Sequence, residues 1–144
     1  MRLLAIDYGE KRIGIAISDE LQSLAHAYRT LQSDSQLFSE IRKIVESEKV
    51  GLIIVGLPKN MDGSLGPSAA KAQSFASRLA TELASIKILL WDERLTTVEA
   101  QRALHLAGKK TRQSKKMIDQ VAAQILLQSY LDSLLWTQPN REEY

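Results

Sequence analysis

The chain has 144 residues, of which 44% are hydrophobic, and a net charge of +2, which is typical of one globular domain with a sizeable core. It contains no cysteine, which excludes disulfides and thiolate zinc sites, and its two histidines, His26 and His105, are too far apart to form a recognisable ligand pair. We therefore expect a single domain over residues 1–136, a polar and flexible tail over residues 137–144, and oxygen ligands for any bound metal.

The first part of the chain contains strong strand signals. Apolar residues 3–6 and 13–17 flank a polar stretch with a glycine, which predicts a β-hairpin, and a weaker third strand fits residues 25–31. Residues 36–48 have helical spacing, and residues 51–57 form a continuous apolar strand.

The second part alternates helical and apolar segments. Residues 67–85 are predicted to be a helix with proline in its first turn, and residues 86–91 a further strand. A helix with capping-box spacing is predicted from residue 96 to about 107, and a last helix over about 114–135. Because the two later strands lack in/out alternation, we expect helices on both faces of a mixed sheet whose inner strands are parallel.

The N-terminal sequence and the absence of long apolar runs bear on location. The first ten residues lack the apolar segment of a secretory signal, and no run approaches the roughly 20 apolar residues of a membrane span. We therefore expect a cytoplasmic protein with no membrane partner.

One stretch, residues 109–116, concentrates positive charge and has no acidic residue. Its five cations are Lys109, Lys110, Arg112, Lys115 and Lys116. Such a stretch is either a solvated loop and helix start or a phosphate-binding patch, and the charges alone leave both interpretations open.

Three places along the chain carry acids that could do chemistry. Asp7 closes an apolar strand, and Asp92 and Glu93 follow the last strand, where α/β proteins place ligands. The alternatives are that Asp7 only binds amides of its turn, and that Asp92 or Glu93 pairs with Arg94.

Asp119 is the most informative acid because it shares the apolar stripe of the last helix. The residues spaced helically from it are Ala122, Ala123, Leu126 and Tyr130, whereas Gln120, Gln124 and Gln128 are expected on a solvated face. The alternative is that Asp119 lies at the edge of this stripe near the helix start, where the helix dipole favours an anion. That stabilisation is only about 0.3–1 kcal/mol, which is too little to offset full burial of the carboxylate.

Carboxylates gathered from these three places would repel one another unless a cation joined them, and hard oxygen ligands suit Mg²⁺ or Mn²⁺. Two such ions can activate a water and stabilise the leaving oxygen in phosphodiester hydrolysis.

The nine-residue connection 58–66 is long for its position between a strand and a helix. Its length indicates either a binding loop or simply a long surface turn.

Four motifs together resemble the YqgF (RuvX) family of bacterial ribonuclease H-like proteins. They are DYGEKRIG at 7–14, GLPKNMDGS at 56–64, DERLTT at 92–97, and KK with DQVAA at 115–123. The resemblance implies an α/β, ribonuclease H-like fold with a five-stranded mixed sheet in the order 3-2-1-4-5, flanked by helices. It implies a catalytic and metal-binding triad of Asp7, Glu93 and Asp119.

The resemblance also implies a nuclease that matures the 5′ end of pre-16S rRNA during ribosome biogenesis, with ribosome-assembly components as further partners. Cleavage of Holliday junctions and non-catalytic nucleic-acid binding are the alternatives. The residues expected to contact nucleic acid are Lys11, Arg12, Asn60, Asp62, Gly63, Ser64, Arg94, Lys109, Lys110, Arg112, Lys115 and Lys116.

Overall fold

The computed structural model of the chain describes residues 1–96 and 115–142, with side chains placed up to residue 96 and from 118 to 135. The strands are β1 (Arg2–Asp7), β2 (Arg12–Ser18), β3 (Ala25–Gln32), β4 (Val50–Leu57) and β5 (Lys87–Asp92). The helices are α1 (Leu37–Ser47), α2 (Pro67–Glu82), the short 3₁₀ helix η1 (Glu93–Leu95) and α4 (Lys115–Glu142).

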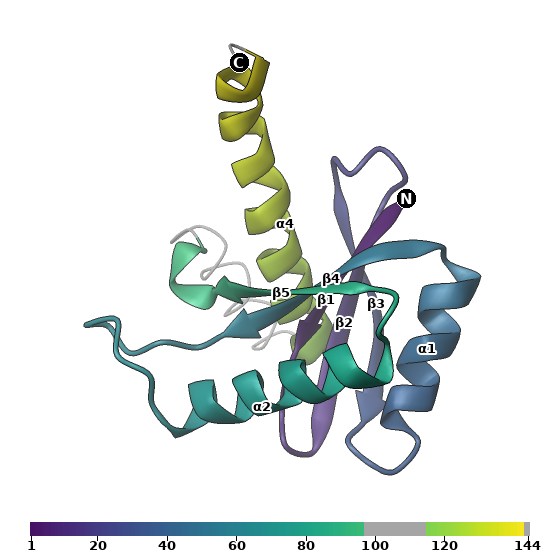
Figure 1. The fold of residues 1–144 in the computed structure, drawn as a ribbon. Helices are drawn as coiled ribbons and strands as arrows, with labels where there is room; N and C mark the ends of the chain where they lie inside the picture. The colour runs from purple at the N-terminus through teal and green to yellow at the C-terminus, as the bar shows by residue number, and fades with distance from the viewer. Residues whose placement is uncertain (97–114, 143–144) are drawn as a thin grey trace.

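The five strands form one mixed sheet in the order β3-β2-β1-β4-β5, so the predicted strand order is confirmed (Figure 1). The strands β1, β2 and β3 pair antiparallel, whereas β4 lies parallel to β1 and β5 parallel to β4. The parallel part places the carboxyl ends of β1, β4 and β5 at one edge of the sheet, where ligands bind in α/β folds.

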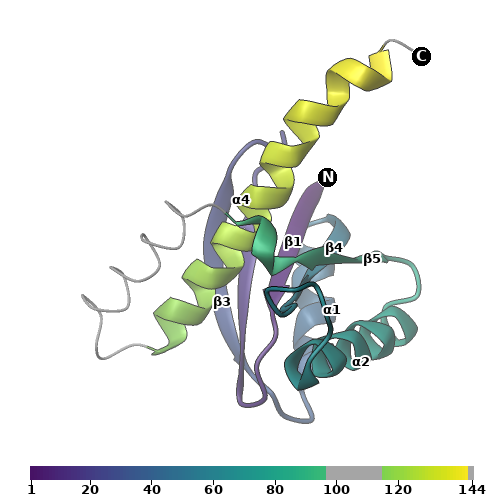
Figure 2. The same cartoon turned by 90° about the vertical axis from the view of Figure 1, so that its left-hand side faces the viewer.

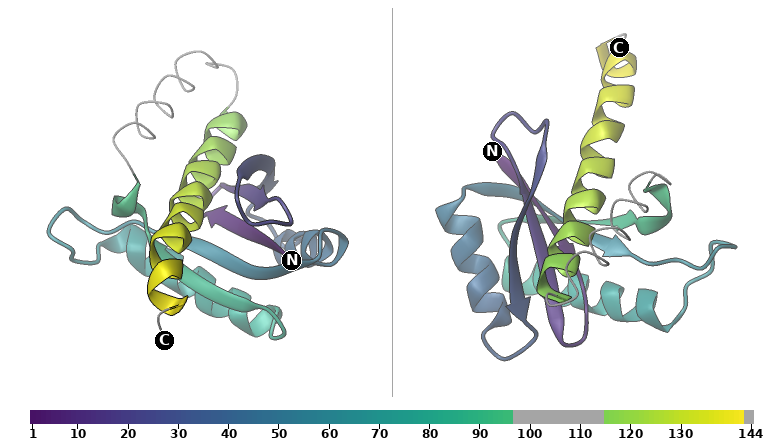
Figure 3. Two further views of the ribbon diagram at one scale, coloured as in Figure 1. Left: turned by 90° about the horizontal axis from the view of Figure 1, so that it is seen from above. Right: turned by 180° about the vertical axis from the view of Figure 1, so that it is seen from behind.

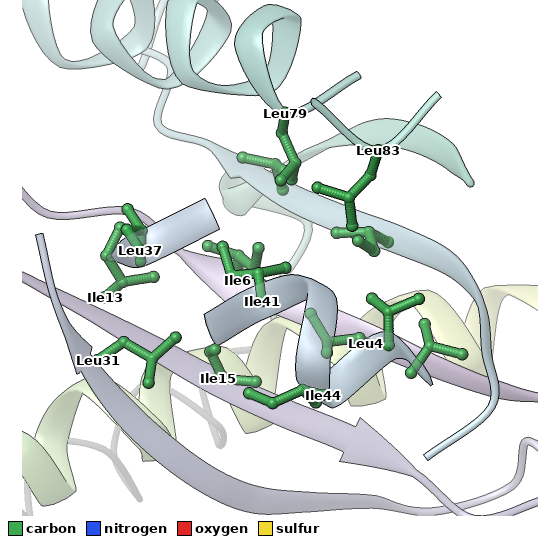
Figure 4. Close-up of a cluster of buried hydrophobic side chains, with 14 of the residues drawn as sticks. Leu4, Ile6, Ile13, Ile15, Leu31, Leu37, Ile41, Ile44, Leu79 and Leu83 are labelled. Carbon is green, nitrogen blue, oxygen red and sulfur yellow. The ribbon is translucent and has the colours of Figure 1, made fainter. Parts of the chain in front are cut away.

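Helices cover both faces of the sheet, which explains why β4 is apolar throughout. The helices α1 and α2 lie on one face and α4 on the other (Figure 2). Alternate residues of β1 serve the two layers: Leu4 and Ile6 pack with α1 and α2 (Figure 4), and Leu3 and Ala5 pack with α4. By the same alternation Asp7 belongs to the α4 side of the sheet.

The last helix is longer than predicted. It was expected to end near Leu135 and to be followed by a tail, but its backbone is helical to Glu142 and extends past the sheet (Figure 3). Helical hydrogen bonds are internal to the segment, so a helix can continue beyond the surface that it covers.

The helix predicted over 96–107 lies almost wholly outside the described residues. Within the described residues, no helix is long and apolar enough to cross a membrane.

Candidate active site

Asp7 ends β1 opposite Gly14 of β2, and its carboxyl group is half-buried. Burial raises the pKa of Asp7 to about 7, with further contributions from the negative charges of Glu93 and Asp119 and from a hydrogen bond with Glu93. All these causes penalise the ionised form. Asp7 therefore lies beside the other two acids of the expected triad and is not a solvated turn aspartate.

Glu93 begins η1 directly after β5 and turns its carboxylate over β4. A Cβ at Gly56 would fall on Glu93 Oε1, so only glycine at position 56 leaves room for this carboxylate. Burial raises the pKa of Glu93, although its hydrogen bond with Asp7 acts in the opposite direction. The raised pKa values and the hydrogen bond mean that the Asp7–Glu93 pair retains a proton more readily than two solvated acids would.

Asp92, next to Glu93, has a different partner. Its carboxylate accepts from the Arg94 guanidinium, with distances of 2.8 Å from Nη2 and 3.1 Å from Nε, and from the Arg94 backbone amide at 2.9 Å. These contacts with Arg94 hold the pKa of Asp92 below its usual range. Of the two candidates, Asp92 is thus the one that pairs with Arg94, and Glu93 is the one that contacts Asp7.

Asp119 lies in the first turns of α4, close to Gly14. A Cβ at Gly14 would overlap the backbone carbonyl of Asp119, so glycine lets α4 approach the sheet closely next to Asp7. The residue that permits this close approach is thus the glycine on β2. The Asp119 carboxylate accepts from Arg12 Nε at 2.9 Å, and both side chains are only 23–29% exposed.

Gln120, Gln124 and Gln128 of α4 contradict the expectation of a solvated face. Gln120 donates to Thr30 Oγ1 at 3.1 Å, Gln124 donates to the Ala25 carbonyl at 3.1 Å, and Gln128 accepts from the Ala25 amide at 2.9 Å. Because β3 is the edge of the sheet, its polar groups need partners, and these amide side chains supply them. Sequence periodicity cannot distinguish a glutamine in water from one that bonds to a strand.

The connection 58–66 folds into a compact turn whose polar side chains bond to one another. Asn60 Nδ2 donates to Ser64 Oγ at 2.9 Å, and Ser64 Oγ donates to Asp62 Oδ1 at 2.6 Å. Gly63 has φ +88°, a left-handed conformation that favours glycine, and the Arg94 Nη1 donates to the Met61 carbonyl at 3.4 Å. The polar residues expected to contact nucleic acid therefore shape the loop, which Arg94 ties to the end of β5.

Of the remaining cations expected at the site, the structure places the side chain of Lys11 only. Lys11 is exposed on the turn between β1 and β2. Lys115 and Lys116 form the start of α4, but their side chains lie outside the described part of the chain, as do Lys109, Lys110 and Arg112 altogether.

The described carboxylates do not form a ready three-ligand metal site. Within residues 1–96 and 118–135, no group of three acids or histidines is close enough to hold an ion. In the structure Arg12 pairs with Asp119 and a hydrogen bond joins Asp7 to Glu93, while the raised pKa of Asp7 agrees with the expectation that clustered carboxylates resist ionisation. The donor set nevertheless fits a hard divalent cation, because the half-buried carboxylates of Asp7 and Glu93 lie together and Gly56 leaves room for that of Glu93.

We predict that Gly56→Ala leaves the fold intact and lowers nuclease activity by roughly 100-fold, because the added methyl displaces the Glu93 carboxylate. The Glu93 side chain can rotate away, so the cost in stability is small. Thermal melts and cleavage assays on the same preparation check this, with Gly51→Ala in the same strand as control, since a Cβ there meets only the flexible Met1 side chain. Full activity of Gly56→Ala would show that the position of Glu93 over β4 does not matter.

Two solved Holliday junction resolvases have the same fold. RuvC of Thermus thermophilus in complex with a Holliday junction matches with a TM-score of 0.59 and 15% identity over 95% of this chain and 97% of that one. The fowlpox virus resolvase matches with a TM-score of 0.55 and 14% identity over 92% and 99%. At this identity the likeness shows the fold alone, which is the ribonuclease H-like fold of the resolvases.

Closer relatives identify the family. The model of the family "RuvX: Holliday junction resolvase" matches residues 1–133. Proteins named "Putative pre-16S rRNA nuclease" from Thermoanaerobacter pseudethanolicus and a Geobacillus species are 48% and 42% identical, over 92% of this chain and 97% and 99% of theirs. The chain belongs to the RuvX family and is a nuclease, a hydrolase of phosphodiester bonds.

Proposed function

We propose that the protein is a metal-dependent endonuclease that processes the 5′ end of pre-16S rRNA during ribosome biogenesis. The observation that carries the proposal is the Asp7–Glu93 pair, two desolvated carboxylates joined by a hydrogen bond at the carboxyl edge of the sheet, beside Asp119. Desolvated acids with raised pKa values in such a position are typical of catalytic sites. The names of the relatives support the RNA substrate.

In this proposal Asp7, Glu93 and Asp119 hold Mg²⁺ or Mn²⁺. A bound pair of such ions supplies activation of the attacking water and stabilisation of the negative charge that develops on the phosphate. Arg12 exchanges the Asp119 carboxylate for a substrate phosphate, because guanidinium binds either group in the same geometry. Asp92 holds Arg94 against the loop at Met61 and thereby keeps η1, and with it Glu93, in place.

Cytoplasmic location and ribosome-assembly partners are part of the same proposal, since pre-rRNA is processed where ribosomes assemble. A second candidate is the resolution of branched DNA, which the family description and the fold of RuvC favour. Phosphate contacts do not distinguish the two substrates.

The decisive test compares two end-labelled substrates, a pre-16S rRNA fragment with its 5′ extension and a four-way DNA junction, each with Mg²⁺, Mn²⁺ or EDTA. We expect metal-dependent cleavage of the RNA, lost in Glu93→Gln. Asp92→Asn is the comparison, because it weakens only the contact with Arg94 that positions η1, and it should reduce cleavage less than Glu93→Gln. Cleavage of the junction alone would favour the second candidate, and binding without cleavage of either would contradict an enzyme.

The cations at the start of α4 carry a separate prediction. We expect Lys115→Glu with Lys116→Glu to weaken binding across unrelated sequences and to reduce the log–log salt slope by about 1.4–1.8, because two phosphate contacts and their released counterions are lost. Anisotropy titrations at several salt concentrations measure both quantities. An unchanged slope would mean that these lysines are merely solvated.

A further inference from the structure

A pocket lies on the side of the sheet that faces α1 and α2, away from the carboxylates. It has a volume of about 470 Å³ and lies between the two helices at the carboxyl end of β1. Three of its lining residues are aromatic and form a continuous stack: the ring centroids of Tyr8 and Phe75 are 4.7 Å apart, and those of Phe38 and Phe75 are 5.8 Å apart. Phe75 is buried in the core, whereas Tyr8 and Phe38 are only half-buried.

The two cations that line this pocket, Lys71 and Arg78, have different interaction partners. Lys71 forms an ion pair with Glu10, and the one lining acid, Asp34, accepts a hydrogen bond from the Gln36 amide at 2.9 Å. The Arg78 guanidinium lies 4.7 Å from the centroid of the Phe38 ring. Within the described ranges no carboxylate is at ion-pair distance from it. Among the described residues, therefore, nothing competes with an anionic group that enters the pocket and binds Arg78.

We propose that this pocket binds one unpaired nucleotide of the substrate strand, with its base against Tyr8 or Phe38 and its phosphate on Arg78. Aromatic rings with an adjacent arginine are the usual means by which proteins hold unpaired bases of any sequence. The inference rests on the proposed function only in naming nucleic acid as the ligand.

The position of the pocket relative to the carboxylates supports a strand as the source of this nucleotide. Asp7 and Tyr8 are neighbours in the chain, with Asp7 beside α4 and Tyr8 against the core on the α1 and α2 side. The exposed Lys11 lies on the turn that follows them. A strand that passes over this turn can place its scissile phosphate at the acids and a nucleotide a few positions away in the pocket.

Binding is tested without catalysis, in EDTA and about 0.15 M salt, with a fluorescent single-stranded RNA decamer. We expect Arg78→Glu and Phe38→Leu each to weaken binding about tenfold. This is the usual loss of affinity when one base–aromatic stack or one phosphate contact is removed. Phe38→Leu retains apolar volume, and Arg78 is exposed, so both variants should melt like the wild type. Lys87→Glu is the control for net charge, since Lys87 is exposed at the opposite end of the sheet.

A second readout locates the nucleotide directly. Photocrosslinking with 4-thiouridine in the decamer should label peptides that contain Tyr8 or Phe38, and the label should decrease in Arg78→Glu. Equal affinities of all four proteins together with no label on these peptides would overturn the proposal. Uridine 5′-monophosphate that binds as tightly as the decamer would assign the pocket to a free nucleotide and overturn the assignment to a strand. Failure of the proposed function would appear in a different assay, as absence of RNA cleavage by the wild type. The binding assay does not measure cleavage, so the two failures can be distinguished.

Discussion

Asp7→Asn should lower nuclease activity by roughly 1000-fold or more while making the metal-free protein more stable at pH 8. The loss of activity follows because the carboxylate that would hold the metal ion is gone. The gain in stability follows because the pKa of Asp7 is raised to about 7 by burial and by the charges of Glu93 and Asp119. Asparagine keeps the volume and removes the buried charge.

The sign of the pH dependence follows from linkage. A carboxyl group whose pKa is higher in the folded state than in the unfolded state binds its proton more tightly when folded. Its stabilising effect is complete below about pH 4, and it is lost as the pH rises through about 7. The gain of Asp7→Asn over the wild type should therefore be small at pH 4 and reach about 1–3 kcal/mol at pH 8.

Thermal melts in EDTA between pH 4 and pH 8, run beside the cleavage assay, measure both effects. Asp119→Asn is the informative comparison, because Asp119 is paired with Arg12 at 2.9 Å and its neutralisation removes that ion pair. We expect it to lose activity without any gain in stability. An Asp7→Asn protein that is less stable than the wild type at pH 8 would mean that Asp7 is structural.

Gly14→Ala should reduce both stability and activity. A Cβ at this position overlaps the carbonyl carbon and oxygen of Asp119, which are backbone atoms that cannot rotate away. The helix α4 must then shift from the sheet, at a cost of about 3 kcal/mol, or roughly 10 °C in melting temperature. Because Asp119 moves with α4, we also expect roughly 100-fold slower cleavage.

Two other glycines of the sheet provide the controls. Gly51→Ala meets only the Met1 side chain and should be neutral, while Gly56→Ala meets the Glu93 carboxylate and should affect activity alone. Denaturant titrations of the three variants, together with their cleavage rates, separate these cases. A Gly14→Ala protein as stable as Gly51→Ala would show that α4 does not depend on this close approach.

The sequence alone determined the main features of the fold. Continuous apolar strands, helical spacing and the order of the elements predicted the mixed α/β sheet, and the resemblance to one family gave its strand order, which the structure confirms. The acids at the ends of β1 and β5 could also be selected, because carboxyl ends of parallel strands gather at one edge of a sheet. These features depend on local pattern, which a sequence displays directly.

Only the tertiary structure decided how the side chains pair. It places Asp92 on Arg94 and Glu93 on Asp7, and it gives Asp119 the counter-charge of Arg12, which is distant in sequence. It also shows that Gly14 and Gly56 make room for the site, although neither has a backbone conformation that requires glycine. Close approach across a sheet depends on which residues face each other, and that relation arises only when the strands and helices are packed together.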